Sequence, residues 1–469
     1  MKSRLVPDTG AAALSAALAL LIGSVLSCGG GPQVQQQQPP PHASTWTWVN
    51  GASLTNQPGV YGTQGTASPS NVPGARQFPV SWADKSGNLW LFGGNGADST
   101  GPCCYLNDLW KFDGSNWTWV SGSDVGNQAG VYGTKGTPSP SNVPGGRPSS
   151  VTWIDGSGNL WLFGGYGFDS TGTNGELNDL WKFDGSNWTW VSGANVRNQQ
   201  GVYGTKGIPS ASNVPGSRDS SVTWSDSSGN LWLFGGFGLD STGANGNLND
   251  LWKFDGTDWT WVGGSDVVNQ IGVYGTKGTP SPSNVPGARS LAISWTDKSG
   301  NFWLFGGVGA DSTTTSTDLN DLWKFDGNNW TWVSGSDVGD QAGVYGTKGT
   351  AAPSNVPGGR WSAVSWADGS GNLWLFGGAG LDSTGLQGGL NDLWKFDGSN
   401  WTWVSGSNVG RQSGVYGTQG TPSQSNIPGG RLGFVSWSDK KGNLWLFGGG
   451  GYDSTGTFGF LNDLWQFEP

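Results

Sequence analysis

Histidine and glutamate are almost missing from this chain of 469 residues: His42 is the single histidine, and the glutamates are Glu176 and Glu468. The sequence after His42 therefore holds no Ser-His-Asp triad, no histidine general base and no histidine metal ligand. We expect no catalytic residues, no metal and no cofactor in this part of the chain. An enzyme is accordingly the less favoured class of function.

Cysteine is also scarce, with Cys28 near the N-terminus and the adjacent pair Cys103 and Cys104. Two cysteines without histidine are too few for a zinc site. In an oxidising compartment the adjacent pair forms a vicinal disulfide, bonds to another chain or stays reduced, and the sequence leaves these three alternatives open.

Positive charge is in deficit: lysine and arginine number 23 against 33 aspartates and glutamates, a formal net charge of −10. A chain without a basic face has nothing to neutralise phosphates, so nucleic acid is not an expected partner. Direct electrostatic binding to anionic lipid is not expected either.

One long apolar run is present, over residues 11–26 behind Lys2 and Arg4, and it is typical of an export signal rather than of a membrane span. It ends in Val-Leu-Ser-Cys-Gly, which resembles the lipobox of bacterial lipoproteins. The resemblance implies cleavage after residue 27, a lipid on Cys28 as the contact with the membrane, and a periplasmic or cell-surface location. A plain secretory signal and a retained anchor are the alternatives.

Residues 28–44 are rich in Gly, Gln and Pro and are expected to be a tether.

What the chain has in abundance is a repeat. The segment Leu-Asn-Asp-Leu-Trp recurs every 71 residues without insertion, ending at Trp110, Trp181, Trp252, Trp323, Trp394 and Trp465. Each copy has four short runs of aromatic and β-branched residues separated by Gly, Asn, Asp and Pro, which predicts strands A to D. In the first copy these are residues 77–82, 89–92, 109–112 and 117–120. Such small sheets must stack on their neighbours, and radial stacking gives a β-propeller.

The apolar run into Phe-Gly-Gly, the segment Asn-Asp-Leu-Trp-Lys-Phe-Asp and the Trp-centred strand after it resemble the kelch repeat. The resemblance covers residues 46–469 and implies an all-β fold, a six-bladed kelch-type propeller with four antiparallel strands per blade. The copies exceed an ordinary kelch unit by roughly 20 residues, which lie in the connection from strand D to the next strand A. Galactose oxidase, a kelch protein, binds copper through histidines that this chain lacks after His42. Sialic acid mutarotase is another kelch protein, so a carbohydrate-active enzyme is an alternative function for this chain.

The two ends of the repeat region complement one another. The region, assigned to residues 45–469, begins with a lone strand D at residues 46–49, and the last copy stops after strand C at residues 465–467. We expect the N-terminal strand to pair with the C-terminal blade as its outer strand and to close the ring, which removes an open sheet edge. A monomer is expected.

Successive strands run in opposite directions, so the long connections from B to C and from D to A lie at the same end of each sheet. They therefore share one face of the propeller, here called the long-loop face. Loops on a rigid scaffold are where binding sites concentrate. Each copy places an arginine at the start of strand A, where it either binds anions or holds its own loop. These candidates for the ligand face are Arg76, Arg147, Arg218, Arg289, Arg360 and Arg431.

The two residues after each arginine vary between copies, and they include Asp219 and Trp361. This variation indicates either an asymmetric pocket or drift at weakly constrained positions. The favoured function is therefore a membrane-tethered, extracytoplasmic module that binds a protein or a glycan at the long-loop face. An envelope scaffold without a pocket and a carbohydrate-active enzyme of the sialic acid mutarotase kind are the alternatives.

Overall fold

The structure is a computed structural model that describes residues 44–468, apart from the side chain of Cys103. Strands make up all of the regular structure within these residues, from β1 (Thr45–Asn50) to β33 (Phe458–Glu468). In this described part, no helix has the length and apolarity needed to cross a membrane. The predicted signal segment, Cys28 and nearly all of the predicted tether lie outside the described residues.

The first copy shows how one unit is built. Strand A is divided into β2 (Arg76–Gln77) and β3 (Val80–Ala83), and both pair antiparallel with β4 (Leu89–Ala97). The order continues through β5 (Pro102–Phe112) to β6 (Trp117–Ser121). The tight turn from A to B is fixed by Asp84, whose Oδ1 accepts the N–H groups of Ser86 and Asn88, both at 2.9 Å.

The other copies repeat this order, and in the second and fifth copies the long strands B and C are each divided in two. The second copy contains β7 (Val151–Ile154), β8 (Leu160–Phe163), β9 (Tyr166–Phe168), β10 (Asn174–Glu176), β11 (Leu180–Phe183) and β12 (Trp188–Ser192). The third contains β13 (Arg218–Asp219), β14 (Val222–Ser225), β15 (Leu231–Leu239), β16 (Asn245–Phe254) and β17 (Trp259–Gly263). The fourth contains β18 (Arg289–Ser290), β19 (Ile293–Thr296), β20 (Phe302–Gly309), β21 (Thr317–Phe325) and β22 (Trp330–Ser334).

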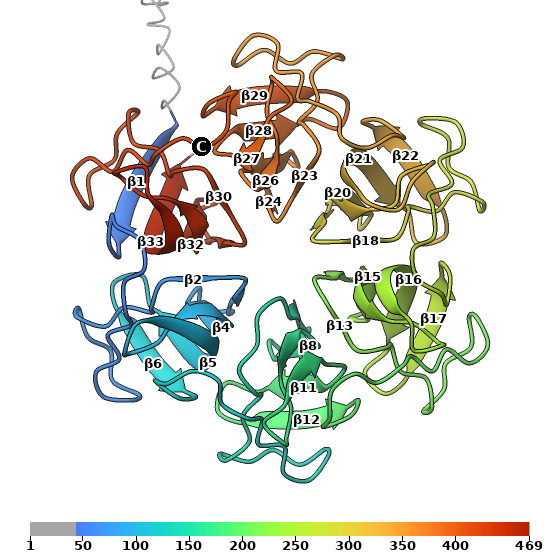
Figure 1. The fold of residues 1–469 in the computed structure, drawn as a ribbon, viewed down its shortest axis with the longest axis horizontal. Coiled ribbons are helices and arrows are strands. Elements are labelled where there is room, and N and C mark those ends of the chain that lie inside the picture. Colours follow the sequence, from blue (N-terminus) through green and yellow to red (C-terminus); the bar gives the residue numbers. More distant parts are fainter. Residues whose placement is uncertain (1–43, 469) are drawn as a thin grey trace, which may run out of the picture. The chain divides into compact units, whose positions relative to one another are not determined.

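The fifth copy contains β23 (Arg360–Trp361), β24 (Val364–Ala367), β25 (Leu373–Phe376), β26 (Ala379–Leu381), β27 (Gln387–Gly389), β28 (Leu393–Phe396) and β29 (Trp401–Ser405). The sixth contains β30 (Arg431–Leu432), β31 (Val435–Ser438), β32 (Leu444–Tyr452) and β33. Its outer strand is β1, which pairs antiparallel with β33 in the register Trp46↔Phe467 and Trp48↔Trp465. Figure 1 shows this pairing as the blue β1 beside the red β33.

Strands B and C extend further than the sequence predicts. The prediction ended strand B before Gly93 and Gly94, whereas β4 continues to Ala97 through a bulge between Phe92 and Gly94. Both glycines have left-handed backbones, with φ of 68° and 102°, so they bend the strand without ending it. The extra pairs of residues lie at the end of the sheet that carries the long loops.

The innermost strands contact one another in a cyclic order, β3, β7, β14, β19, β24, β31 and back to β3. At the break in strand A, each copy donates a backbone N–H to the carbonyl of the equivalent residue of the preceding copy, at 2.5–3.1 Å. The bond from Phe78 N–H to Gly433 O joins the first copy to the last. The sheets therefore surround a central axis, as Figure 1 shows, in the manner of a β-propeller.

Tryptophan fills the space between neighbouring copies. Trp110 and Trp117 are fully buried and meet edge to face, with ring centroids 6.4 Å apart. Trp82 stacks on Trp90 at 5.6 Å, and this pair packs with Leu160 and other core residues of the next copy. The hydrophobic core thus lies between sheets and gives a firm base for the loops at their ends.

Candidate functional site

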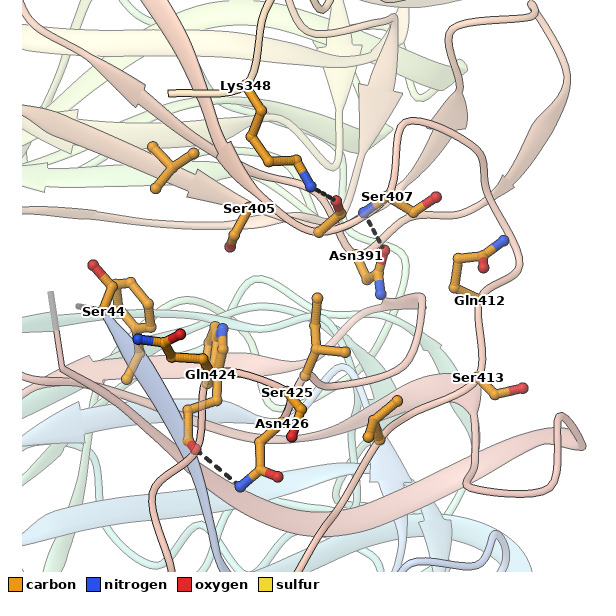
Figure 2. Close-up of a pocket in the computed structure, with 16 residues that line it drawn as sticks. Ser44, Lys348, Asn391, Ser405, Ser407, Gln412, Ser413, Gln424, Ser425 and Asn426 are labelled. Atoms are coloured by element: carbon orange, nitrogen blue, oxygen red, sulfur yellow. Dashed lines mark hydrogen bonds between the residues drawn. The ribbon is translucent and has the colours of Figure 1, made fainter. Parts of the chain in front are cut away.

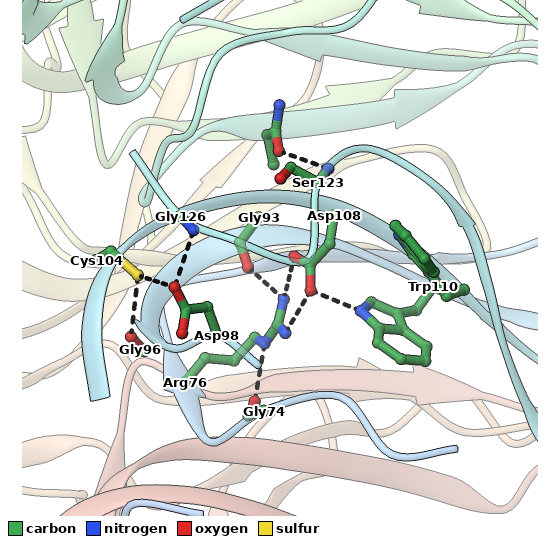
Figure 3. A network of polar contacts seen from close by, with 12 residues as sticks. Gly74, Arg76, Gly93, Gly96, Asp98, Cys104, Asp108, Trp110, Ser123 and Gly126 are labelled. Carbon is green, nitrogen blue, oxygen red and sulfur yellow. Dashed lines mark hydrogen bonds and ion pairs between the residues drawn. The ribbon is translucent and has the colours of Figure 1, made fainter. Parts of the chain in front are cut away.

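The predicted ring of arginines lies inside the sheets. The Arg76 guanidinium forms a bidentate pair with Asp108, with both N–O distances 2.7 Å, and donates further bonds to the carbonyls of Gly74 and Gly93 (Figure 3). Both side chains are fully buried. The same pair recurs in every copy as Arg147–Asp179, Arg218–Asp250, Arg289–Asp321, Arg360–Asp392 and Arg431–Asp463.

Asp108 is itself saturated, because its Oδ2 also accepts bonds from Tyr61 Oη at 2.8 Å and from Trp110 Nε1 at 2.7 Å. Burial and the Asp108 carboxylate raise the pKa of Tyr61 well above its ordinary value, so the phenol stays protonated. Arg76, its loop and strand C are therefore tied together by one buried network. The arginines contribute no exposed donor to the long-loop face, so they are not ligand-face residues in this structure.

The two long connections meet at that face. Asn127, from the D to A connection, donates its N–H to Tyr105 O at 2.7 Å and accepts the Tyr105 N–H at 3.0 Å. Asp98, from the B to C connection, accepts the Gly126 N–H at 3.1 Å, as Figure 3 shows. The ends of strands A, B and C are thereby held in a fixed frame beneath the loops.

Three positions in this frame change from copy to copy, and the strand register places them side by side. In the third copy Asp219 pairs with Phe237, and Phe237 pairs with Asn247. We call such a set a variable row. The six rows are Gln77-Asn95-Tyr105, Pro148-Tyr166-Glu176, Asp219-Phe237-Asn247, Ser290-Val308-Asp318, Trp361-Ala379-Gly389 and Leu432-Gly450-Phe460. Pro148 lies outside the strands, and its carbonyl accepts the Tyr166 N–H at 3.1 Å.

Sequence reasoning identified only the first position of each row. The other two positions also differ between copies, the second between two constant glycines and the third before a constant Leu-Asn-Asp, so the signal was present in the repeat itself. Their common location was hidden because it depends on the longer strands B and C.

Neighbouring rows meet at what we call junctions. The N–H of Arg218 bonds to Leu177 O at 2.9 Å, which sets the first position of the third copy beside the last position of the second. Asp219 and Glu176 meet there, and each carboxyl group influences the pKa of the other. Glu176 is only 5% exposed, whereas Asp219 is half-buried.

This acid pair is electrostatically unusual. Burial and the neighbouring Asp219 raise the pKa of Glu176 strongly, and burial raises that of Asp219. Burial, Tyr166 and Asp219 also raise the pKa of Tyr105. The Tyr105 phenol is therefore close enough to interact with Asp219. Tyr105 meets Tyr166 edge to face, with centroids 5.9 Å apart. Residues of three consecutive copies therefore converge at one point.

Trp361 belongs to a different junction, two copies further along the chain. It is half-buried and pairs with Ala379. Asp318, from the preceding copy, accepts a bond from Gln387 Nε2 at 3.0 Å, and burial together with Asp340 raises its pKa to about 6. The structure thus brings Asp219 together with Glu176. It places Trp361 at the junction between the fourth and fifth copies.

Cys104 is buried and disulfide-bonded, and its Sγ lies 3.4 Å from Asp98 Oδ2. The side chain of Cys103 lies outside the described residues. The pairing of Cys103 with Cys104 therefore stays a prediction.

Three other hollows are weaker candidates. A pocket of about 610 Å³ beneath the loops of the fifth and sixth copies is lined by Lys348, whose Nζ donates to Gly406 O at 2.8 Å (Figure 2). An equivalent pocket with Lys206 recurs in the third and fourth copies, so it follows from the repeated packing. The central channel contains a cavity of about 270 Å³ lined by residues 79–81 and their counterparts in every copy.

No protein-family model matches the chain, and no curated protein matches it either. Among solved structures the chain is similar to YjhT, at 15% identity over 84% of this chain and 95% of that one, with a TM-score of 0.49. A fungal alcohol oxidase of the AA5 family, in complex with copper, is 14% identical over 88% of this chain and 76% of its own, with a TM-score of 0.45. A protein of unknown function from Dyadobacter fermentans is 9% identical over 88% of this chain and 97% of that one, with a TM-score of 0.45.

Proposed function

We propose that the chain is a binding module that takes a glycan at the long-loop face of a six-bladed, kelch-type β-propeller sealed by β1. The observation that carries this proposal is the variable row. The copies share most of their residues, and three of the positions at which they differ are neighbours on adjacent strands at one face.

The chemistry of the rows suits a hydroxyl-rich ligand. Phe237 is 39% exposed, and Trp361 and Tyr166 are half-buried, so aromatic rings are presented to solvent at this face. Aromatic faces give large apolar contact with the C–H face of a sugar ring, and a few placed polar groups fix its orientation. Asp219, Gln77 and Asn95 provide such groups at the same level.

A glycan array probed with the purified chain tests the proposal. We expect binding to at least one glycan, and a loss of about tenfold in affinity for Trp361→Ser, which copies Ser290 of the fourth copy. Thr257→Ala, on an exposed turn between strands C and D, is the matched control and leaves binding unchanged. Absence of any bound glycan would favour the scaffold, and unchanged binding by Trp361→Ser would place the ligand elsewhere.

A carbohydrate-active enzyme is the second candidate, because two neighbouring carboxyl groups with raised pKa values are suited to general acid–base chemistry. Nuclear magnetic resonance of any bound sugar tests this candidate. Conversion of the sugar by the wild-type chain, lost in Asp219→Ser, would establish it, and an unchanged sugar would leave a binding module.

We also propose that the module is a monomer, exported and held at a bacterial membrane by a lipid on Cys28, with residues 28–44 as the tether. The sequence of the N-terminus supports this proposal. Labelled fatty acid incorporated by the wild-type chain and absent from Cys28→Ala would support it further. Incorporation that persists in Cys28→Ala would contradict it.

A further inference from the structure

The junction between the second and third copies differs from the others in charge. Its facing positions are both acids, Glu176 and Asp219, and no other junction carries an acid at both positions. The corresponding pair in the next junction is Asn247 and Ser290. The scaffold therefore forms the same junction without the acids, and packing does not explain their presence.

Among the described residues, the acid pair at this junction has no basic side chain in an ion pair with it. Within residues 44–468, the ion pairs all join an arginine to the aspartate of its own copy, and Arg218 is occupied by Asp250. Arg197 lies nearby with its aliphatic part over Gly175, but none of these ion pairs includes it. Glu176 Oε2 is buried and accepts no hydrogen bond from the described residues. Buried carboxyl oxygens without partners are costly, which is expected where a ligand completes the site.

The surroundings of the pair are aromatic. Phe237 neighbours Asp219 on the adjacent strand and is 39% exposed. Tyr105 and Tyr166 approach from the first and second copies. Asp219 is the more exposed of the two acids, and Glu176 is almost completely buried. A carboxylate flanked by aromatic rings attracts an ammonium group through both Coulomb and cation–π terms.

We propose that this junction is a subsite for a protonated primary amine, and that the glycan bound at the long-loop face carries an amino sugar with a free amino group. The inference rests on the proposed glycan-binding function and names the chemistry of its ligand. Asp219 pairs with the ammonium group, Glu176 supports Asp219, and the aromatic residues cover the sugar.

Isothermal titration calorimetry with a glucosamine tetrasaccharide and its fully N-acetylated counterpart tests this proposal on the mature chain. We expect the free amine to bind at least about tenfold more tightly, because acetylation removes the charge. The double variant Glu176→Asn and Asp219→Ser copies the next junction, so the scaffold tolerates it, and it loses this preference. Arg197→Met is the matched control, and it keeps the preference because it removes a cation and no acid.

Equal affinity of the wild-type chain for the two tetrasaccharides would overturn the amine subsite, as would a preference that survives in the double variant. If both tetrasaccharides fail to bind while the array identifies another glycan, the subsite is wrong and the binding module stands. If no glycan binds on the array, the proposed function fails first.

Discussion

At the scale of residues, one buried arginine–aspartate ion pair links the strands of each copy. Arg289 donates two charge-assisted hydrogen bonds to the Asp321 carboxylate in a fully buried pair, and two backbone carbonyls accept its other hydrogen bonds. Removing one member leaves the other charge buried and uncompensated, which is more costly than the net contribution of the pair. The sequence revealed the arginine by its recurrence. The aspartate, 32 residues further on, became its partner only through the pairing of strands A, B and C.

Arg289→Met is therefore expected to reduce the free energy of unfolding by about 3–5 kcal/mol. Urea denaturation followed by tryptophan fluorescence measures this change. Arg411→Met is the control, since Arg411 is exposed and bonds only to Gln387 O through its guanidinium. Equal effects of the two substitutions would contradict the structural role of the buried arginines.

The acid pair gives a pH-dependent prediction. The folded chain raises the pKa of Glu176 above 4.5, its ordinary value, so the folded state holds a proton that the unfolded state releases above that pH. Glu176 therefore lowers stability increasingly as pH rises above 4.5 and has no such effect at lower pH, where both states are protonated.

Glu176→Gln is expected to raise the melting temperature by about 2–4 °C near pH 8 and to have little effect near pH 4. Differential scanning calorimetry at both values checks this prediction, with Asn247→Gln as a neutral control at the equivalent position. A gain that is largest at low pH would contradict the assignment of a raised pKa. A stabilising change at a binding residue is also what a trade-off between stability and function predicts.

At the scale of elements, β1 completes the sheet of the sixth copy. Trp46 is buried between Phe376 and Phe467, with ring centroids 5.1 and 4.9 Å away, so β1 contributes core as well as backbone pairing. The sequence predicted this strand from the complementary ends of the repeat region. It missed the extension of strands B and C, because a pair of glycines indicates a turn as readily as a bulge.

Deletion of residues 45–49 is expected to lower the melting temperature by several degrees and to reduce solubility, because it uncovers the edge of β33 and removes Trp46. Thermal unfolding and sedimentation after mild heating measure these effects. Ser44→Ala, at an exposed position just before β1, is the control and changes neither. Unchanged behaviour of the deletion variant would mean that β1 does not seal the propeller.

At the scale of the whole molecule, the repeat determines the fold and the departures from the repeat determine the candidate site. Identical Trp, Arg and Asp residues in each copy made the strand pattern and its six-fold recurrence predictable. The meeting of Glu176 with Asp219 was not predictable, because these residues belong to different copies and are joined only by the packing of neighbouring sheets. The same packing leaves Trp361 in another junction, although it occupies the position equivalent to Asp219.

The most direct measurement is glycan binding by a symmetrised chain, in which every variable row is replaced by Ser, Val and Asn. Each of these residues already occupies its row position in one copy, at Ser290, Val308 and Asn247. We predict that this chain keeps the circular dichroism and melting temperature of the wild type to within a few degrees and loses the glycans that the wild type binds on the array. Retention of the same glycans with unchanged affinity would contradict the claim that the variable rows form the binding site.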